Sequence, residues 1–105
     1  RVGFGQSTYA TSKAALVQLT KAMALELGEK GIRVNALCPG SFLTDMNAGY
    51  LDSEAGRAML DSTPFRRSGE LPELDGPLLL LASDAGSFMT GAAVPVDGGH
   101  LVSSL

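Results

Sequence analysis

Apolar residues recur every three or four positions over residues 8–30, with charged side chains placed between them. This spacing predicts one helix with a buried apolar face. Gly31 can adopt the left-handed conformation and is expected to end the helix. The side chains expected on the buried face are Leu16, Leu19, Met23 and Leu27.

The pattern changes directly after this glycine. Residues 32–38 are β-branched at first and mostly apolar later, as in a strand covered on both faces, and Pro39-Gly40 ends it as a turn. Residues 92–97 form a second apolar stretch rich in strand-forming residues. The turn Asp97-Gly98-Gly99 closes it, so a second strand is expected there.

Residues 41–69 lack a regular period and are interrupted by glycine and proline. We expect a mobile flap here, with a short helix near residues 53–60. A longer helix is expected over residues 72–83, where Pro77 should either kink the helix or delay its start. The apolar flap residues could line a substrate pocket or simply pack the flap; they are Phe42, Met46, Tyr50, Leu51, Met59 and Phe65.

The predicted order is helix, strand, flap, helix, strand, which indicates an α/β fold with two parallel strands and a right-handed crossover. Two strands are too few for a sheet whose first strand is covered on both faces. The 105 residues are therefore expected to be an incomplete domain, with its other strands in another chain or in a longer polypeptide.

Charge and composition exclude several kinds of partner. The net charge is −3, and acidic and basic residues are mixed along the chain, which argues against nucleic acid and anionic membrane surfaces. No apolar run is long enough to span a bilayer, and no signal peptide is visible. The single Cys38 cannot form an internal disulfide and fits a reducing, cytoplasmic compartment. His100 stands alone, so no metal site is expected.

Candidate chemistry begins with Tyr9 and Lys13, which lie one helical turn apart on the same helix face. An ammonium beside a phenol favours the phenolate, as a proton donor and acceptor requires. Such a pair arises by chance in roughly one chain in five of this length, so its context decides. Ser12 lies between the two and is expected to bond its own helix backbone, without a catalytic role.

Six further short motifs follow this pair. They are Ile32-Arg33-Val34-Asn35-Ala36, Pro39-Gly40 with Thr44, Arg67-Ser68-Gly69-Glu70, Leu81-Ala82-Ser83-Asp84, Thr90-Gly91 and Val96-Asp97-Gly98-Gly99. Together with Tyr9-Ala10-Thr11-Ser12-Lys13-Ala14-Ala15, in this order and spacing, they resemble the C-terminal portion of the short-chain dehydrogenase/reductase family. The resemblance covers essentially all 105 residues.

The resemblance implies the C-terminal part of a Rossmann-type doubly wound parallel sheet. It also implies an oxidoreductase that interconverts a secondary alcohol and a ketone with NAD or NADP. Tyr9 would exchange the proton with the substrate oxygen. Lys13 would assist it and hold the nicotinamide ribose. Residues 78–84 and the chain ending, residues 97–105, resemble members that act on sugar acids, polyols or 3-oxoacyl compounds, which implies a substrate of one of these classes.

Cofactor contacts are also implied beyond the tyrosine and lysine. Pro39 and Gly40 would turn the chain so that the Phe42 backbone reaches the nicotinamide carboxamide, and Thr44 would bond the carboxamide or the diphosphate. Without the upstream pair, Pro39-Gly40 would be an ordinary turn and Thr44 an exposed hydroxyl. Arg66-Arg67 is expected to form surface or interface ion pairs.

The family's glycine-rich turn and catalytic serine would precede Tyr9, and neither is in these 105 residues. We therefore expect an active homotetramer only of a longer protein, and an inactive segment otherwise. The alternative is a non-catalytic remnant or assembly module that uses the same elements for oligomerisation. Apolar residues on several sides of the first helix fit either assembly.

Overall fold

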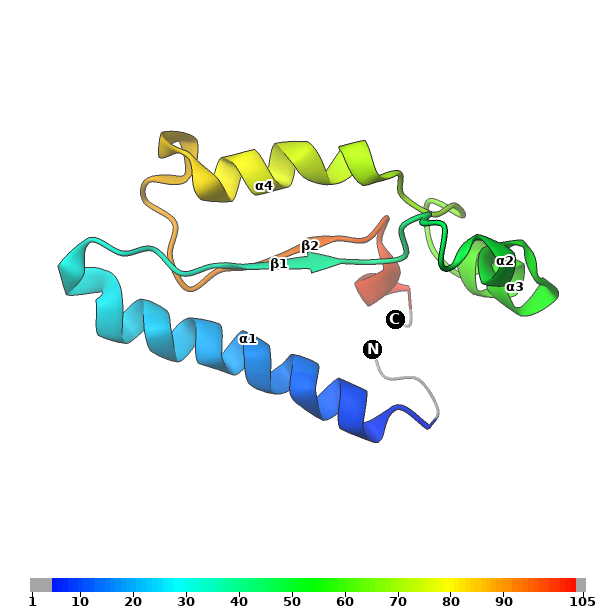
Figure 1. The fold of residues 1–105 in the computed structure, drawn as a ribbon, viewed down its shortest axis with the longest axis horizontal. Coiled ribbons are helices and arrows are strands. Elements are labelled where there is room, and N and C mark those ends of the chain that lie inside the picture. Colours follow the sequence, from blue (N-terminus) through cyan, green and yellow to red (C-terminus); the bar gives the residue numbers. More distant parts are fainter. Residues whose placement is uncertain (1–4, 104–105) are drawn as a thin grey trace. The chain divides into compact units, whose positions relative to one another are not determined.

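The structure is a computed structural model, and it describes residues 5–103. Its elements, labelled in Figure 1, run in the order helix, strand, two flap helices, helix, strand. Two compact units divide the chain. The first unit comprises residues up to Leu37 together with Leu79–Val94, and the second comprises Cys38–Leu78 together with residues from Pro95 onward. The elements are α1 (Ser7–Leu27), β1 (Ala36–Pro39), α2 (Ala48–Asp52), α3 (Glu54–Asp61), α4 (Asp75–Ala82) and β2 (Ala93–Val96).

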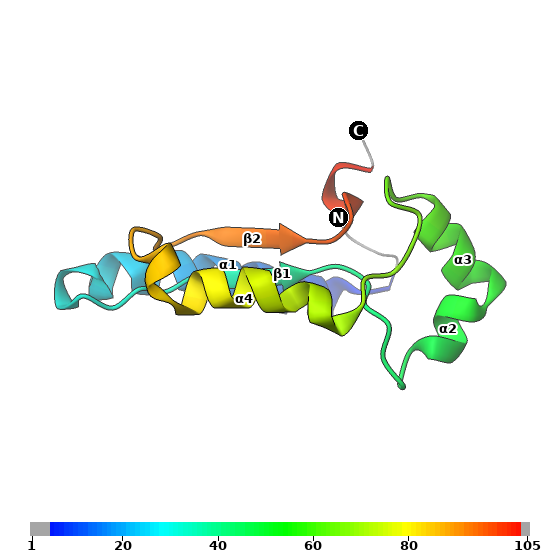
Figure 2. The same cartoon turned by 90° about the horizontal axis from the view of Figure 1, so that it is seen from above.

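Strands β1 and β2 are hydrogen-bonded neighbours that run in the same direction (Figures 1 and 2). The Ala36 N–H donates to the Ala92 carbonyl at 2.8 Å, and four residues later the Gly40 N–H donates to the Val96 carbonyl at 2.9 Å. The equal offset at both positions means that the register is kept along the pair. The two strands form the only named sheet among residues 5–103.

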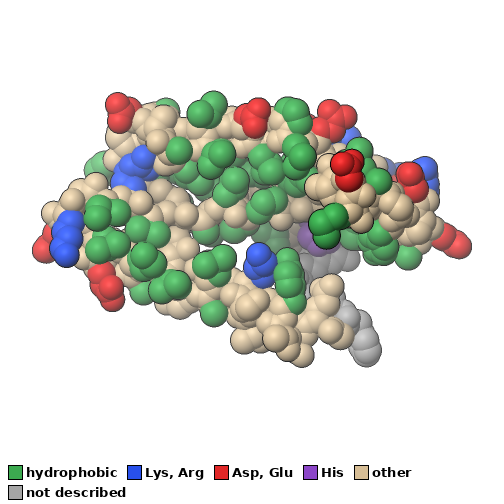
Figure 3. All heavy atoms as spheres, in the orientation of Figure 1, with side chains coloured by type: hydrophobic (Ala, Val, Ile, Leu, Met, Phe, Trp, Pro, Cys, Tyr) green, Lys and Arg blue, Asp and Glu red, His purple; other side chains and the backbone are tan. Residues whose placement is uncertain are grey.

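Helix α1 buries a different face from the predicted one. Its buried residues are Thr20 and Ala24, whereas Leu16, Leu19 and Met23 are exposed. The prediction was wrong because it placed the largest apolar side chains inside. Hydrophobic side chains are consequently visible on the surface along α1 (Figure 3).

Small side chains explain why this face of α1 can be buried. The Thr20 hydroxyl donates to the Leu16 carbonyl at 2.9 Å, so its polar atom is satisfied within the helix. A Cβ built on Gly91 would lie 3.4 Å from the Ala24 Cβ, which places the two backbones in close contact. A leucine at either position would not fit this spacing. Close approach therefore determines the buried face.

The first strand begins later than predicted. Residues 32–35 do not belong to β1, which starts at Ala36. Their polar groups bond side chains or the loop before β2: the Val34 N–H donates to the Thr90 hydroxyl at 3.1 Å, and the Gly91 N–H donates to the Val34 carbonyl at 2.7 Å. These bonds replace a strand ladder over the first half of the predicted segment.

Two polar side chains of the same segment reinforce these bonds. Arg33 donates to the Ser83 carbonyl at 3.1 Å, and the Asn35 amide donates to the Met89 carbonyl at 3.0 Å. The Asn35 Oδ1 also accepts from the Ala92 N–H at 3.0 Å. One amide therefore satisfies a donor and an acceptor of the chain that leads into β2.

The predicted flap contains two helices rather than one. Helix α3 begins one residue later than the short helix predicted near residues 53–60, and it is capped by Ser53, whose hydroxyl accepts from the Gly56 N–H at 3.1 Å. Helix α2 precedes it directly and was not predicted, because five residues are too few to show a helical period. A Cβ on Gly56 would lie 2.8 Å from the Leu51 Cα, so a glycine is required where the two helices meet.

Both ends of the flap are joined by a parallel bridge between Phe42 and Gly69. The Leu43 N–H donates to the Gly69 carbonyl at 2.9 Å, and the Gly69 N–H donates to the Ser41 carbonyl at 2.8 Å. The Phe42 ring lies against Gly69, where a Cβ would clash with it. The start and the end of the flap are therefore fixed to each other.

Helix α4 starts later than the predicted residue 72. A late start was one of the two effects predicted for Pro77. A 3-10 turn covers Leu71–Leu74, and α4 begins at Asp75, so Pro77 is the third residue of the helix. Backbone N–H groups in the first turn of a helix have no partner within the helix, and a proline there removes no helical hydrogen bond.

Candidate functional site

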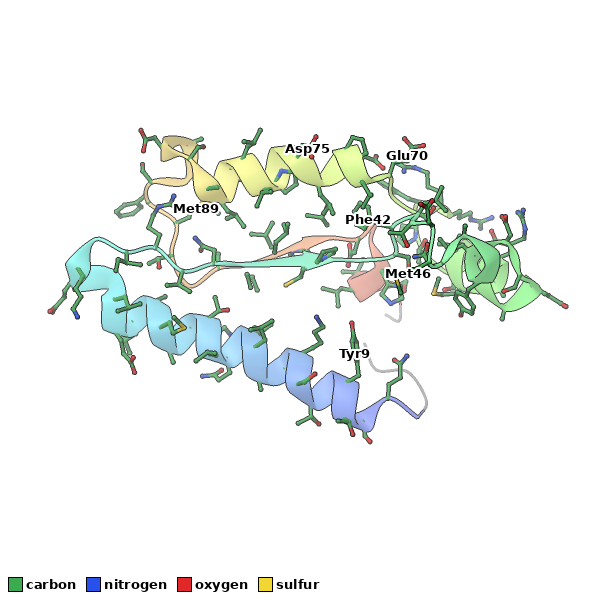
Figure 4. The ribbon with its side chains drawn as sticks, in the orientation of Figure 1. Tyr9, Phe42, Met46, Glu70, Asp75 and Met89 are labelled. Atoms are coloured by element: carbon green, nitrogen blue, oxygen red, sulfur yellow. The ribbon has the colours of Figure 1, made fainter. Side chains whose placement is uncertain are left out.

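The tyrosine and lysine singled out in the sequence both project from the first two turns of α1. The Lys13 Nζ lies 5.4 Å from the centre of the Tyr9 ring. Tyr9, labelled in Figure 4, is 60% exposed, and no residue among 5–103 is hydrogen-bonded to its hydroxyl. The phenol is therefore held near a positive charge while its oxygen stays accessible.

Ser12 bonds its own helix, as expected. Its hydroxyl donates to the Tyr9 carbonyl at 2.7 Å. This bond uses the only proton of the serine hydroxyl, which argues against a role for Ser12 as a proton donor.

Pro39 and Gly40 end β1 within the second unit. A Cβ on Gly40 would lie 2.7 Å from the Cα of Asp97, so only a glycine permits the backbones to approach so closely. Asp97 is itself held by its own turn, because its carboxylate accepts from the N–H groups of Gly99 at 2.9 Å and Leu101 at 3.0 Å. The turn after β1 is thus packed against a rigid neighbour.

Phe42 and Thr44 follow this turn. The Phe42 side chain is buried, at 9% exposure, whereas its backbone N–H has no hydrogen-bond partner in the described part of the chain. Thr44 is half-buried, and its hydroxyl likewise bonds no residue among 5–103. A backbone donor and a hydroxyl two residues apart are therefore available to a ligand. Tyr9 and Lys13 belong to the first unit, whereas Pro39, Gly40, Phe42 and Thr44 belong to the second.

Asn47 is a residue of this segment that sequence reasoning missed. Its amide nitrogen donates to the Phe42 carbonyl at 2.6 Å, and its amide oxygen accepts from the Thr44 N–H at 2.8 Å. Asparagine directly before a helix is a recognised N-cap signal. Because helix α2 itself was not predicted, Asn47 was not identified as its N-cap.

A cavity of about 180 Å³ lies within the second unit. Among the apolar flap residues named from the sequence, Phe42 and Phe65 line it, whereas Met46 is 98% exposed (Figure 4). Its charged lining groups include Arg67 and Glu73, which bind each other. The cavity is small, and these two charges are already paired.

Arg67 forms the ion pair expected of the Arg66-Arg67 dipeptide. Its guanidinium donates to both carboxylate oxygens of Glu73, at 2.8 and 2.9 Å, and the Glu70 N–H donates to the same carboxylate at 2.8 Å. These bonds, first that from Arg67 and then that from Glu70, lower the pKa of Glu73 to about 2. The carboxylate in turn raises the pKa of Arg67.

Residues 5–103 show neither a membrane-spanning helix nor a metal-binding cluster. None of the helices there combines the length and the apolar character needed to cross a bilayer. No three side chains of the histidine, cysteine, aspartate or glutamate type gather there in an arrangement that could hold a metal ion. Cys38 has intermediate exposure.

Comparisons with known proteins identify the family. The family model described as enoyl-(acyl carrier protein) reductase matches residues 1–100. A short-chain type dehydrogenase/reductase from Mycobacterium ulcerans is 36% identical, and its structure superposes with a TM-score of 0.84 over 90% of this chain and 34% of that chain. The chain belongs to the short-chain dehydrogenase/reductase family. The resemblance predicted from the motifs is confirmed.

Two other members of this family are similar to the chain. L-xylulose reductase of Bos taurus is 45% identical over 98 residues, covering 92% of this chain and 40% of the relative. A gluconate 5-dehydrogenase from Burkholderia cenocepacia J2315, in complex with NADP and tartrate, is 37% identical with a TM-score of 0.85, over 91% of this chain and 38% of that chain. The fold is accordingly the C-terminal part of a Rossmann-type doubly wound parallel sheet. The chain spans 34–40% of the length of the curated relatives that it matches.

Proposed function

We propose that the chain carries the proton-transfer pair of an NAD(P)-dependent oxidoreductase that interconverts a secondary alcohol and a ketone. The observation that carries the proposal is the placement of the Lys13 ammonium 5.4 Å from the centre of the Tyr9 ring, beside an accessible phenol. The proposal concerns the full-length protein that contains these residues. The 105 residues alone are expected to be inactive.

Tyr9 is the group that moves the proton. In ketone reduction its hydroxyl donates a proton to the substrate oxygen, and the resulting phenolate is stabilised by the positive charge of Lys13. In alcohol oxidation the phenolate accepts that proton back. A bound nicotinamide supplies or accepts the hydride at the substrate carbon. Proton transfer by a positioned side chain accelerates such reactions by roughly 10²–10⁴-fold.

The residues present fit a nicotinamide dinucleotide, either NAD or NADP. Gly40 permits a tight turn, the Phe42 N–H offers a donor, and the Thr44 hydroxyl offers a donor and an acceptor. Lys13 would hold the ribose hydroxyls with its remaining donors. NADP is bound in the similar gluconate 5-dehydrogenase, which supports the proposal without choosing between the two dinucleotides.

The substrate class that we propose is a small ketone or alcohol of the sugar-acid, polyol or 3-oxoacyl type. Relatives named L-xylulose reductase and gluconate 5-dehydrogenase support the first two, and a relative named 3-oxoacyl-[acyl-carrier-protein] reductase supports the third. A cytoplasmic location is proposed as well, on the single cysteine of the chain.

Assembly is favoured by the exposed apolar residues of α1. Leu16, Leu19 and Leu25 are 53%, 52% and 85% exposed, which is costly for a helix that stays in water. We propose that the full-length protein is a homotetramer, to be checked by light scattering after size exclusion. A module that served assembly alone would form the same oligomer but bind no dinucleotide.

Replacement of Tyr9 tests the proposal. In the full-length protein, Tyr9→Phe should lower kcat by about 10²–10⁴-fold, because the proton donor is lost, while the Kd of the dinucleotide stays nearly unchanged. The matched control is Thr11→Ala, an exposed position on the same helix, which should keep wild-type kcat. Steady-state turnover of a panel of ketones and calorimetric titration of the dinucleotide measure the two quantities. Full activity of the Phe variant would refute the role of Tyr9.

A further inference from the structure

We infer that Asn47 is a positioning residue for the dinucleotide: its amide side chain fixes the backbone from Phe42 to Thr44 in the shape that a ligand meets. The inference rests on the proposed function, and it deepens that function by naming a residue that does not itself touch the ligand. No feature of the sequence motifs points to Asn47. The two hydrogen bonds of its side chain do.

The geometry is a clamp across three residues. The Asn47 Nδ2 donates to the Phe42 carbonyl at 2.6 Å, and the Asn47 Oδ1 accepts from the Thr44 N–H at 2.8 Å. The clamp uses the carbonyl of Phe42 and the N–H of Thr44. The Phe42 N–H and the Thr44 hydroxyl take no part in the clamp and can bind a ligand. Neither has a hydrogen-bond partner among the described residues.

Only a carboxamide side chain can close this clamp. It presents one donor and one acceptor in the same plane, whereas a carboxylate offers acceptors alone and a short hydroxyl cannot reach both groups. The clamp holds the two peptide planes between Phe42 and Thr44, because the Phe42 carbonyl and the Thr44 N–H belong to them. The plane before Phe42 is held at its other end, where the Gly69 N–H donates to the Ser41 carbonyl at 2.8 Å, and the Phe42 ring is buried, at 9% exposure. With the backbone bonded on both sides of Phe42, the Phe42 N–H and the Thr44 hydroxyl keep a fixed spacing before any ligand arrives, which lowers the entropy cost of binding.

The same residue joins this segment to the flap helices. The N–H groups of Asn47 and Ala48 both donate to the Thr44 carbonyl, at 3.2 and 3.1 Å, and the Leu51 N–H donates to the Asn47 carbonyl at 2.9 Å. Thr44 and Asn47 are therefore bonded through both their backbones and the asparagine side chain. Helix α2 begins directly from this closed turn.

The experiment uses the full-length protein and two replacements of Asn47. Asn47→Ala removes both side-chain bonds, and Asn47→Asp keeps the size but replaces the donor to Phe42 with a carboxylate oxygen. We expect the Kd of the preferred dinucleotide, NADH or NADPH, to rise about tenfold in the alanine variant and at least about threefold in the aspartate variant. At saturating dinucleotide, kcat should also fall, because the nicotinamide is less well oriented.

Calorimetric titration gives the Kd, and thermal unfolding without dinucleotide tells positioning from simple destabilisation. Asp45→Asn, an exposed neighbour, is the control and should keep wild-type Kd. A raised Kd in variants that remain folded supports the inference, and the aspartate variant keeps the test available if the alanine variant does not fold. Wild-type Kd in both Asn47 variants would overturn it. If the wild-type protein itself bound neither dinucleotide, the proposed function would fail instead.

Discussion

Tyr9 and Lys13 project from a regular helix of 21 residues, whereas Phe42 and Thr44 lie in irregular backbone between a strand and a five-residue helix. The first unit holds the chain before β1 with polar side chains that bond backbone groups, chiefly those of Asn35. The second unit holds its irregular segment with the amide of Asn47 and with glycines where backbones touch, such as Gly40 and Gly56. A regular helix positions side chains by its own geometry, but an irregular segment needs contacts from outside to keep its shape.

The largest effect is expected at the glycine between the flap helices. Gly56→Ala places a methyl group against α2, where a Cβ would lie 2.8 Å from the Leu51 Cα, so the full-length protein should lose about 3 kcal/mol of unfolding free energy. The urea midpoint measures this loss, and hydrogen exchange should show lost protection over residues 42–69 but not over α1.

Gly49→Ala is the matched control for this change. Gly49 lies in α2 with nothing within 4 Å of its missing Cβ, and alanine should raise stability by about 0.5–1 kcal/mol. Equal losses at both glycines would mean that the contact at Gly56 does not hold the second unit together.

A smaller effect is expected in the first unit at Asn35. Asn35→Ala leaves the Met89 carbonyl and the Ala92 N–H without their side-chain partner, so about 2 kcal/mol should be lost. Gln18→Ala, an exposed amide on α1, should change stability by less than about 0.5 kcal/mol. Denaturant unfolding of the full-length protein compares the two. Unchanged stability of Asn35→Ala would show that these side-chain bonds do not hold the chain before β1.

The smallest effect concerns the ion pair between Arg67 and Glu73. The pKa of Glu73 is lowered from 4.5 to about 2, so its contribution to stability is complete above pH about 4.5 and is lost as the pH falls through about 2. In Glu73→Gln this pH dependence should disappear. Carboxyl carbon shifts followed by NMR between pH 6 and pH 2 measure the titration directly, and an ordinary Glu73 titration midpoint would contradict the bidentate pair.

Several elements follow from local sequence alone. The period of apolar residues predicted the long helix, and the short helix predicted near residues 53–60 corresponds to α3. The late start of α4 was one of the two alternatives that Pro77 left open, and it places the proline in the first turn, where proline is tolerated. Tyr9 and Lys13 could be named because one turn of a helix fixes their spacing, whatever the rest of the protein does.

Other features depend on residues far apart in the chain, and local patterns do not contain them. The buried face of α1 is set by Ala24 meeting Gly91, and the late start of β1 by Asn35 bonding Met89 and Ala92. Asn47 was missed for a different reason: asparagine before a helix is a recognised signal, but α2 has only five residues and was not itself predicted. Hydrophobicity ranks residues by type and says nothing of how closely two backbones can approach.

The bonds of Asn35 also bear on how the protein is made. Its partner at Ala92 lies 57 residues further along the chain. At synthesis rates of roughly 5–20 residues per second, a ribosome needs about 3–11 s to add these residues. During that time the segment before β1 has been made, but the loop before β2 that it bonds has not. Contacts of such long range form slowly. A newly made chain can therefore form helix α1, whose hydrogen bonds are local, well before it can form the strand that follows it.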